Sequence, residues 1–211
     1  MKLYDCRVAP NPRRARMFLA EKGIDIDMVE VDILGGENLQ DEFLKINPRG
    51  LLPVLQLDDG TRIDEVMAIC RYFEELYPEP PLLGRNALEK ALVTNRQRKM
   101  EFEGMIAASE VFRNQHENFT KRSLPGAGKH ELPAIPALID RGTQTLGRFF
   151  QALENYLDDA DFVAGEIFTM ADITAVCAID FAAWVDIKIP ESNPLTLAWY
   201  ERVSARPSAK A

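Results

Sequence analysis

The amino-acid sequence predicts two domains: an α/β domain with the element order βαβ-ββα, followed by an all-helical domain. The first 78 residues alternate short strand patterns with helical patterns. The segment from Tyr77 to Gly84 then carries three prolines within four residues, which resist both helix and sheet. Every long pattern after it has helical spacing. We therefore place the domains at residues 1–78 and 87–211, with a linker at 79–86.

The α/β domain begins with a short strand at Lys2–Tyr4. The helix after it carries Ala15, Phe18 and Leu19 at amphipathic spacing, and Gly23 is a natural stop because glycine tolerates the left-handed C′ position. Four further elements are predicted in order: an alternating, half-buried strand at 26–33, a short helix within 38–47, a hairpin over 51–64 that turns at Asp59-Gly60, and a helix over 65–76.

The second domain is predicted to contain helices at 86–119, 135–157, 170–187 and 195–205. A loop rich in proline and glycine, Arg122 to Pro136, separates the first two. The third helix has a capping-box start, with Thr169 as N-cap, Asp172 at N3, and Phe168 placed to pack on Ile173. These residues serve folding rather than chemistry.

Composition excludes several classes of function. The chain has 25 basic and 33 acidic residues, and a net charge of −8 repels nucleic acid and anionic membranes. Cys6, Cys70 and Cys177 are odd in number and widely spaced, which suits a reducing compartment. There is no metal-ligand spacing, no apolar leader and no apolar run of about 18 residues. We expect a cytoplasmic protein without a metal.

The start of the first helix is the first candidate site. Asn11 and Pro12 suit the N-cap and N1 positions, because asparagine accepts a bond from a first-turn N–H and proline has none to leave unpaired. One interpretation is a well-capped helix and nothing more. The other is an anion site, since a helix N-terminus directly after a strand favours an anion such as a thiolate.

Two further stretches add to this candidate site. Leu52-Pro53 opens a strand and is a candidate cis peptide, which would leave the Leu52 backbone free of the sheet. Asp64 and Glu65 stand at the start of the next helix, where they serve either as a cap or as part of a site for a carboxylate and an ammonium group.

Four stretches carry a resemblance to a known family: "LYDCRVAPNPRRARMFLAEKGI", "NPRGLLPVL", "DEVMAICRYFEELYP" and "VAGEIFTMADIT". They resemble bacterial cytosolic glutathione S-transferases of the serine or asparagine type, over essentially the whole chain. The resemblance implies a thioredoxin-like N-terminal domain that binds glutathione. It also implies a helical domain that closes a pocket for the electrophile, and a homodimer.

The resemblance implies roles for individual residues. Asn11 and the backbone of Ala9 would stabilise the glutathione thiolate, and Cys6 is a further candidate thiol whose alternative is a small buried residue. The glutathione-binding set is Leu52, Pro53, Glu65, Val66, Arg49 and Leu51. Met100, Met105 and Phe112 would line the electrophile pocket, although methionines at helical spacing also serve as core.

The sequence departs from the family pattern at three positions. Ala9 stands where a serine or cysteine is usual, and Val66 replaces a serine that binds the γ-glutamyl carboxylate. Leu51 stands where a lysine, glutamine or arginine often contacts the glycyl carboxylate, for which Arg13 or Arg49 would compensate.

Three functions follow from the resemblance. The first is a glutathione S-transferase, a detoxification enzyme that conjugates reduced glutathione, its co-substrate, to small hydrophobic electrophiles. Asn11 favours an alternative, the glutathione-dependent reduction of disulfides or peroxides. Ala9 and Val66 favour another, a non-catalytic binding or interaction protein of the same fold.

Overall fold

The computed structural model describes all of residues 1–211, and its first half is built on a mixed four-stranded sheet of order β2-β1-β3-β4. The central strand β1 (Lys2–Asp5) pairs in parallel with β2 (Asp27–Glu30) and antiparallel with β3 (Val54–Gln56). β3 in turn pairs antiparallel with β4 (Arg62–Asp64). This is the predicted βαβ-ββα order, and it confirms the α/β fold of the N-terminal half.

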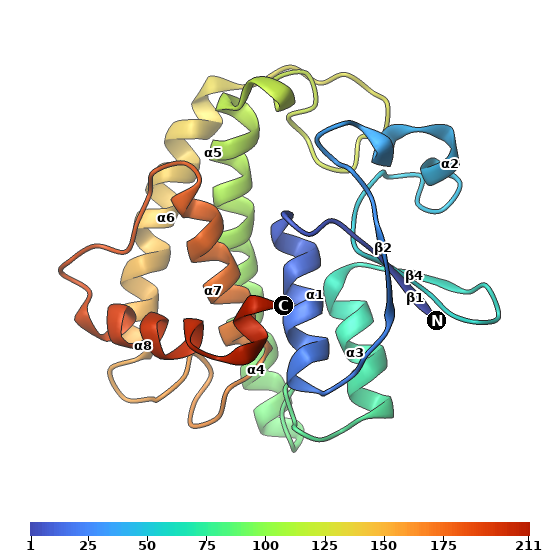
Figure 1. Ribbon diagram of the computed structural model, residues 1–211. Coiled ribbons are helices and arrows are strands. Elements are labelled where there is room, and N and C mark those ends of the chain that lie inside the picture. Colours follow the sequence, from blue (N-terminus) through green and yellow to red (C-terminus); the bar gives the residue numbers. More distant parts are fainter.

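Two helices cover the side of the sheet that faces the rest of the chain, as Figure 1 shows for α1 (Pro10–Glu21) and α3 (Val66–Leu76). Gly23 follows α1 with a φ of +64°, which confirms its role as the helix stop. The short helix expected within 38–47 forms as a 3₁₀ turn at Glu37–Leu39 followed by α2 (Asp41–Leu44).

One strand prediction was wrong in its extent. The strand expected at 26–33 is only four residues long, and three of its four residues are exposed rather than alternating between core and solvent. The reason is its place at the edge of the sheet, where apolar and acidic residues alike face solvent.

The second half is entirely helical, as predicted. Its elements are α4 (Ala87–Lys99), a π-helical segment at Met100–Ile106, α5 (Ala107–Gln115), a 3₁₀ turn at Glu117–Phe119, α6 (Pro136–Tyr156), α7 (Met170–Ala183), α8 (Pro194–Ser204) and a last 3₁₀ turn at Pro207–Lys210. None of these helices combines the length and the apolar character that a membrane crossing requires.

The two halves share one core. Helix α1 packs against α7 (Figure 1), where Cys177 Sγ lies 3.6 Å from Met17 Sδ. A second pair of sulfur atoms, Cys70 Sγ and Met170 Sδ, lies 3.9 Å apart between α3 and α7. A continuous cluster of 36 buried apolar residues runs through both halves.

The predicted capping box of α7 is confirmed, and it does more than cap. Thr169 and Asp172 make the reciprocal bonds, and Asp172 is fully buried. Its carboxylate also accepts from the backbone N–H of Val163 at 2.9 Å and from Nε1 of Trp199 at 3.0 Å. One side chain therefore joins the start of α7 to the preceding loop and to α8.

Candidate functional site

Three chain segments meet at one end of the strands. The register pairs Tyr4 with Val54 in antiparallel strands, so β1 runs toward the end of the sheet at which β3 begins. β4 ends at the same end of the sheet, since Asp64 also pairs with Val54. The loop before α1, the Leu52-Pro53 peptide and the start of α3 therefore lie together.

The start of α1 corrects the predicted cap. The N-cap is Ala9 and Pro10 is the first helical residue, so Asn11 is not the N-cap and makes no capping bond. Two prolines fit the N1 preference equally well in the sequence, and the chain uses the first of them. Because Pro10 and Pro12 have no N–H, Asn11 provides the one free backbone donor among the first three helical residues.

The other two candidates in this loop have little to offer a ligand. The backbone N–H of Ala9 donates to the carbonyl of Cys6 at 2.9 Å, which uses the donor expected for a thiolate. Cys6 is 3% exposed, and burial raises the pKa of its thiol. Cys6 therefore remains a protonated core residue, and Asn11 is the polar group exposed in the first turn of α1.

A buried ion pair anchors the loop. Nη1 of Arg16 lies 2.6 Å and 2.8 Å from the two carboxylate oxygens of Asp5, and both residues are buried. Nη2 of Arg16 also donates to the carbonyl of Arg7 at 2.8 Å. Helix α1 thus holds the end of β1 and the loop that follows it in one arrangement.

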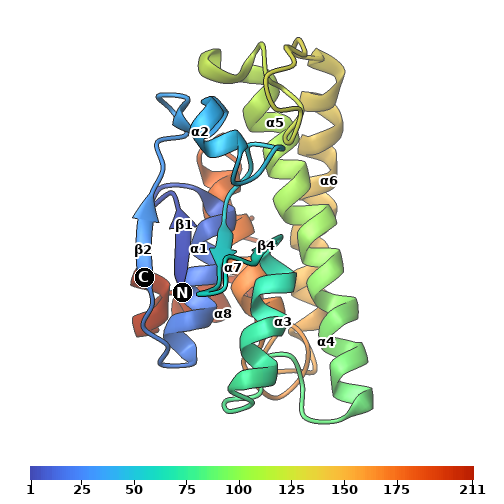
Figure 2. The same ribbon diagram turned by 90° about the vertical axis from the view of Figure 1, so that its right-hand side faces the viewer.

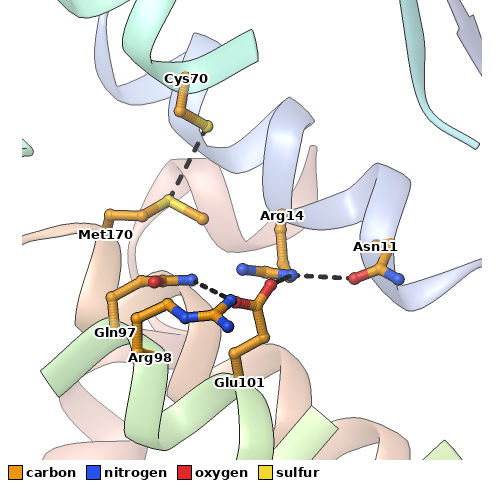
Figure 3. A network of polar contacts seen from close by, with 7 residues as sticks. All are labelled: Asn11, Arg14, Cys70, Gln97, Arg98, Glu101 and Met170. Atoms are coloured by element: carbon orange, nitrogen blue, oxygen red, sulfur yellow. Dashed lines mark hydrogen bonds and ion pairs between the residues drawn. The ribbon is translucent and has the colours of Figure 1, made fainter. Parts of the chain in front are cut away.

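Asn11 is exposed and its side chain has one hydrogen-bond partner. Its Oδ1 accepts from Nη1 of Arg14 at 2.9 Å, and the same nitrogen lies 3.1 Å from Oε1 of Glu101 (Figure 3). This contact was not predicted, because Glu101 lies 87 positions from Arg14 along the chain.

The Leu52-Pro53 bond is cis, as the sequence predicted. The N–H and the carbonyl of Leu52 make no hydrogen bond within the protein, whereas the carbonyl of Leu51 accepts from Asn47 Nδ2 at 3.0 Å. The Leu52 side chain is buried in a small cluster with Tyr4 and Phe43. A firmly held residue whose backbone donor and acceptor are both free is able to pair with an extended peptide ligand.

The start of α3 presents a second helix N-terminus. Glu65 occupies the N-cap position, as one of the two interpretations expected, but it has a φ of +67° and its side chain makes no capping bond. The N–H groups of Val66 and Met67 lie in the first turn and have no acceptor within the helix. The Glu65 carboxylate is largely exposed and accepts from Nη1 of Arg49 at 2.9 Å.

The loop between α5 and α6 lies on the first half of the chain, near α2 (Figure 1). Nη2 of Arg122 donates to the carbonyl of Ile33 at 3.0 Å, and Lys129 forms an ion pair with Asp41. A Cβ on Gly126 would lie 2.9 Å from Nη2 of Arg49 and 3.2 Å from Cδ1 of Leu51. The loop that the sequence marked only as a connector therefore covers the expected glycyl end of the site.

Of the three candidates for the electrophile pocket, two lie in the core and one is partly exposed. Met100 and Met105 are 0% and 5% exposed and belong to the core, so packing accounts for both. Phe112 is partly exposed. Its ring centroid lies 4.8 Å from that of His116 and 5.6 Å from that of Trp184, which is 50% exposed. These rings form an aromatic wall.

Comparison with known proteins agrees with this architecture. The family models described as glutathione S-transferase, N-terminal domain, and glutathione S-transferase, C-terminal domain, match residues 3–81 and 112–207. Glutathione S-transferase 2 of Saccharomyces cerevisiae is 33% identical over 100% of this chain and 88% of its own length.

Two solved structures are similar over nearly their whole length. The crystal structure of Gtt2 from Saccharomyces cerevisiae matches with a TM-score of 0.89 and 34% identity, covering 100% of this chain and 99% of that one. A glutathione S-transferase domain-containing protein from Marinobacter aquaeolei matches with a TM-score of 0.88 and 34% identity, covering 99% of both chains.

Proposed function

The chain belongs to the glutathione S-transferase family, and from that premise we propose that the end of the sheet where Leu52 has a free backbone N–H and carbonyl binds reduced glutathione and activates its thiol. The protein is a glutathione transferase, with glutathione as its co-substrate. The observation that carries the assignment of the site is Leu52, whose backbone N–H and carbonyl are both free beside a cis proline. The cysteinyl backbone of glutathione would pair with it as an added antiparallel strand.

The two ends of glutathione would be held on either side of the Leu52 backbone. The free N–H groups of Val66 and Met67 suit the γ-glutamyl carboxylate, because a helix N-terminus favours an anion. The exposed Glu65 carboxylate suits the γ-glutamyl ammonium group. Val66 has no hydroxyl to add to this site, and Leu51 has no charge for the glycyl carboxylate, which leaves Arg49 as the nearby cation.

The thiol would lie at the start of α1. The backbone N–H and the Nδ2 amide group of Asn11 are both free to donate, and the positive end of the helix dipole favours the thiolate. The thiol proton leaves to solvent, the sulfur forms a bond to the electrophilic carbon, and the leaving group departs with the electron pair of the broken bond. Phe112 and Trp184 supply an aromatic wall for a small hydrophobic electrophile.

We also propose a homodimer in the cytoplasm. Four apolar residues are exposed at helical spacing on α4 and on the π-helical segment that continues it: Leu88, Leu92, Phe102 and Ile106, at 69%, 48%, 52% and 42%. Helix α4 runs along the outside of the molecule (Figure 2). A second copy would cover this apolar stripe, and light scattering at micromolar concentration should give the mass of two chains. A single-chain mass would contradict the dimer.

The proposed location in the cytoplasm is supported by the cysteines. All three are unpaired and buried, which suits a reducing compartment.

Titration calorimetry with reduced glutathione, together with conjugation of a haloarene, tests the proposed site. We expect binding in the micromolar to low-millimolar range and a bound thiol whose pKa lies below its value in free glutathione, measured by ultraviolet absorbance of the thiolate against pH. Absence of binding at millimolar glutathione would overturn the proposal. A mixed disulfide as second substrate shows whether the same thiolate also supports reduction.

Asn11→Ala should raise the pKa of the bound thiol by about 1 and lower kcat/KM about tenfold at pH values below that pKa, because a hydrogen bond to the anion is lost. Since a higher pKa means less thiolate at a given pH, the activity profile should move to higher pH. Val8→Ala is the control, because Val8 lies in the loop directly before α1 and is 60% exposed. An unchanged profile in Asn11→Ala would remove Asn11 from the site.

A further inference from the structure

Arg14 is a buried cation one helical turn after Asn11. It lies on α1, is 1% exposed, and its Nη1 contacts both Asn11 Oδ1, at 2.9 Å, and Glu101 Oε1, at 3.1 Å. Figure 3 shows its guanidinium between Asn11 and the π-helical segment that carries Glu101. The contact with Glu101 crosses from the first half of the chain to the second.

This contact fixes which way the Asn11 amide faces. A guanidinium carries only donors, so the atom that Asn11 presents to Arg14 must be its carbonyl oxygen. The amide nitrogen is then directed away from Arg14, and it has no hydrogen-bond partner in the protein. Because Asn11 is exposed, this nitrogen is a donor available to a ligand.

Arg14 is itself held from the second half of the chain. Glu101 also accepts from Nε2 of Gln97 at 3.2 Å and from Nη1 of Arg98 at 2.5 Å. Burial disfavours its charged form, but Arg14 together with Gln97 and Arg98 holds the pKa of Glu101 below its ordinary value. One carboxylate thus faces two guanidinium groups, and Nε and Nη2 of Arg14 are buried with no hydrogen-bond partner. A buried arginine with two nitrogen atoms that lack hydrogen-bond partners calls for a role besides packing.

We propose that Arg14 is a positioning residue, which locks the Asn11 carboxamide with its oxygen inward and its NH₂ group toward the glutathione sulfur. This inference rests on the proposed function of Asn11. It makes the orientation of the thiolate donor depend on Glu101, so that the helical half of the chain helps to set the acidity of a thiol bound by the other half.

The test compares Arg14→Gln and Arg14→Lys in the full chain, each in the wild-type and in the Asn11→Ala background. The measured quantity is the pKa of the bound glutathione thiol. Glutamine both donates and accepts, so the Asn11 amide is free to face either way, whereas lysine, like arginine, only donates. We expect Arg14→Gln to raise the thiol pKa by about 1 and Arg14→Lys to leave it near the wild-type value.

In the Asn11→Ala background Arg14→Gln should have no further effect, because Arg14 acts through Asn11. An equal effect in both backgrounds would mean that the charge of Arg14 acts directly on the thiolate, and it would overturn the proposal. So would a wild-type pKa in Arg14→Gln. If wild type and Asn11→Ala do not differ, the proposed role of Asn11 has failed instead.

A second measurement does not depend on the folding of Arg14 variants. The side-chain NH₂ resonances of Asn11 in the wild-type protein are identified by their loss in Asn11→Ala. They should shift when glutathione binds and shift again as its thiol titrates. NH₂ resonances that stay in place throughout would overturn the proposed orientation.

Discussion

Asp172→Ala is expected to lower the free energy of unfolding by about 3–7 kcal/mol. The carboxylate accepts from the N–H of Val163 and of Thr169, both at 2.9 Å, and from Nε1 of Trp199 at 3.0 Å. Losing a cap costs about 1 kcal/mol, and each further buried donor left without a partner costs about 1–3 kcal/mol. Because a domain has only about 5–15 kcal/mol of stability, the variant should lie close to unfolding.

Urea unfolding followed by circular dichroism measures this loss. Asp159→Ala is the matched control, since it removes an exposed aspartate from the loop that precedes α7. Asp172→Asn keeps one acceptor oxygen, so its stability should lie between those of wild type and Asp172→Ala. A loss of less than about 1 kcal/mol in Asp172→Ala would show that the surrounding donors find water instead.

Arg16→Leu should cost about 3–5 kcal/mol and weaken glutathione binding, because it leaves Asp5 buried without its partner. Asp5 is 3% exposed, and burial raises its pKa above 3.8 even beside Arg16. Without Arg16 that pKa rises further, so the protonated form is favoured in the folded state. The destabilisation should therefore be largest at neutral pH and should shrink as the pH falls toward 4, where the unfolded chain is protonated as well.

Unfolding measured at several pH values, with glutathione titration on the same samples, checks this result. The double variant Asp5→Leu/Arg16→Leu should recover much of the stability, since it leaves no unpaired buried charge. Arg7→Leu is the control, because Arg7 is exposed in the same loop. If Arg16→Leu proves as stable as Arg7→Leu, the buried pair does not hold the loop.

The fold could be predicted where the signal is local. The capping box at Thr169 and Asp172 fixed the start of α7, and helical periodicity located α6 and α8 to within about two residues. The edge strand β2 was predicted too long, because periodicity does not report which strand lies at an edge. The helix expected at 86–119 is interrupted by the π-helical turns at Met100–Ile106, for which the sequence has no distinct signature.

The site was predictable to the same extent. Leu52-Pro53 was found because only proline makes a cis bond accessible. The cap at Asn11 was wrong because two prolines compete for the same position, and Met100 and Met105 at helical spacing do not reveal that they face the core. Arg14, Glu101 and the loop over Leu51 were missed, because each depends on contacts between distant parts of the chain.

The shared core has a consequence for how this chain can change in evolution. Met17 and Cys70 from the first half meet Cys177 and Met170 from the second, within one uninterrupted apolar cluster. Without the other half, each half would expose its share of this apolar cluster to water, so the chain should unfold as one cooperative unit. Recombination with a relative would therefore have to exchange the contacting residues of both halves together.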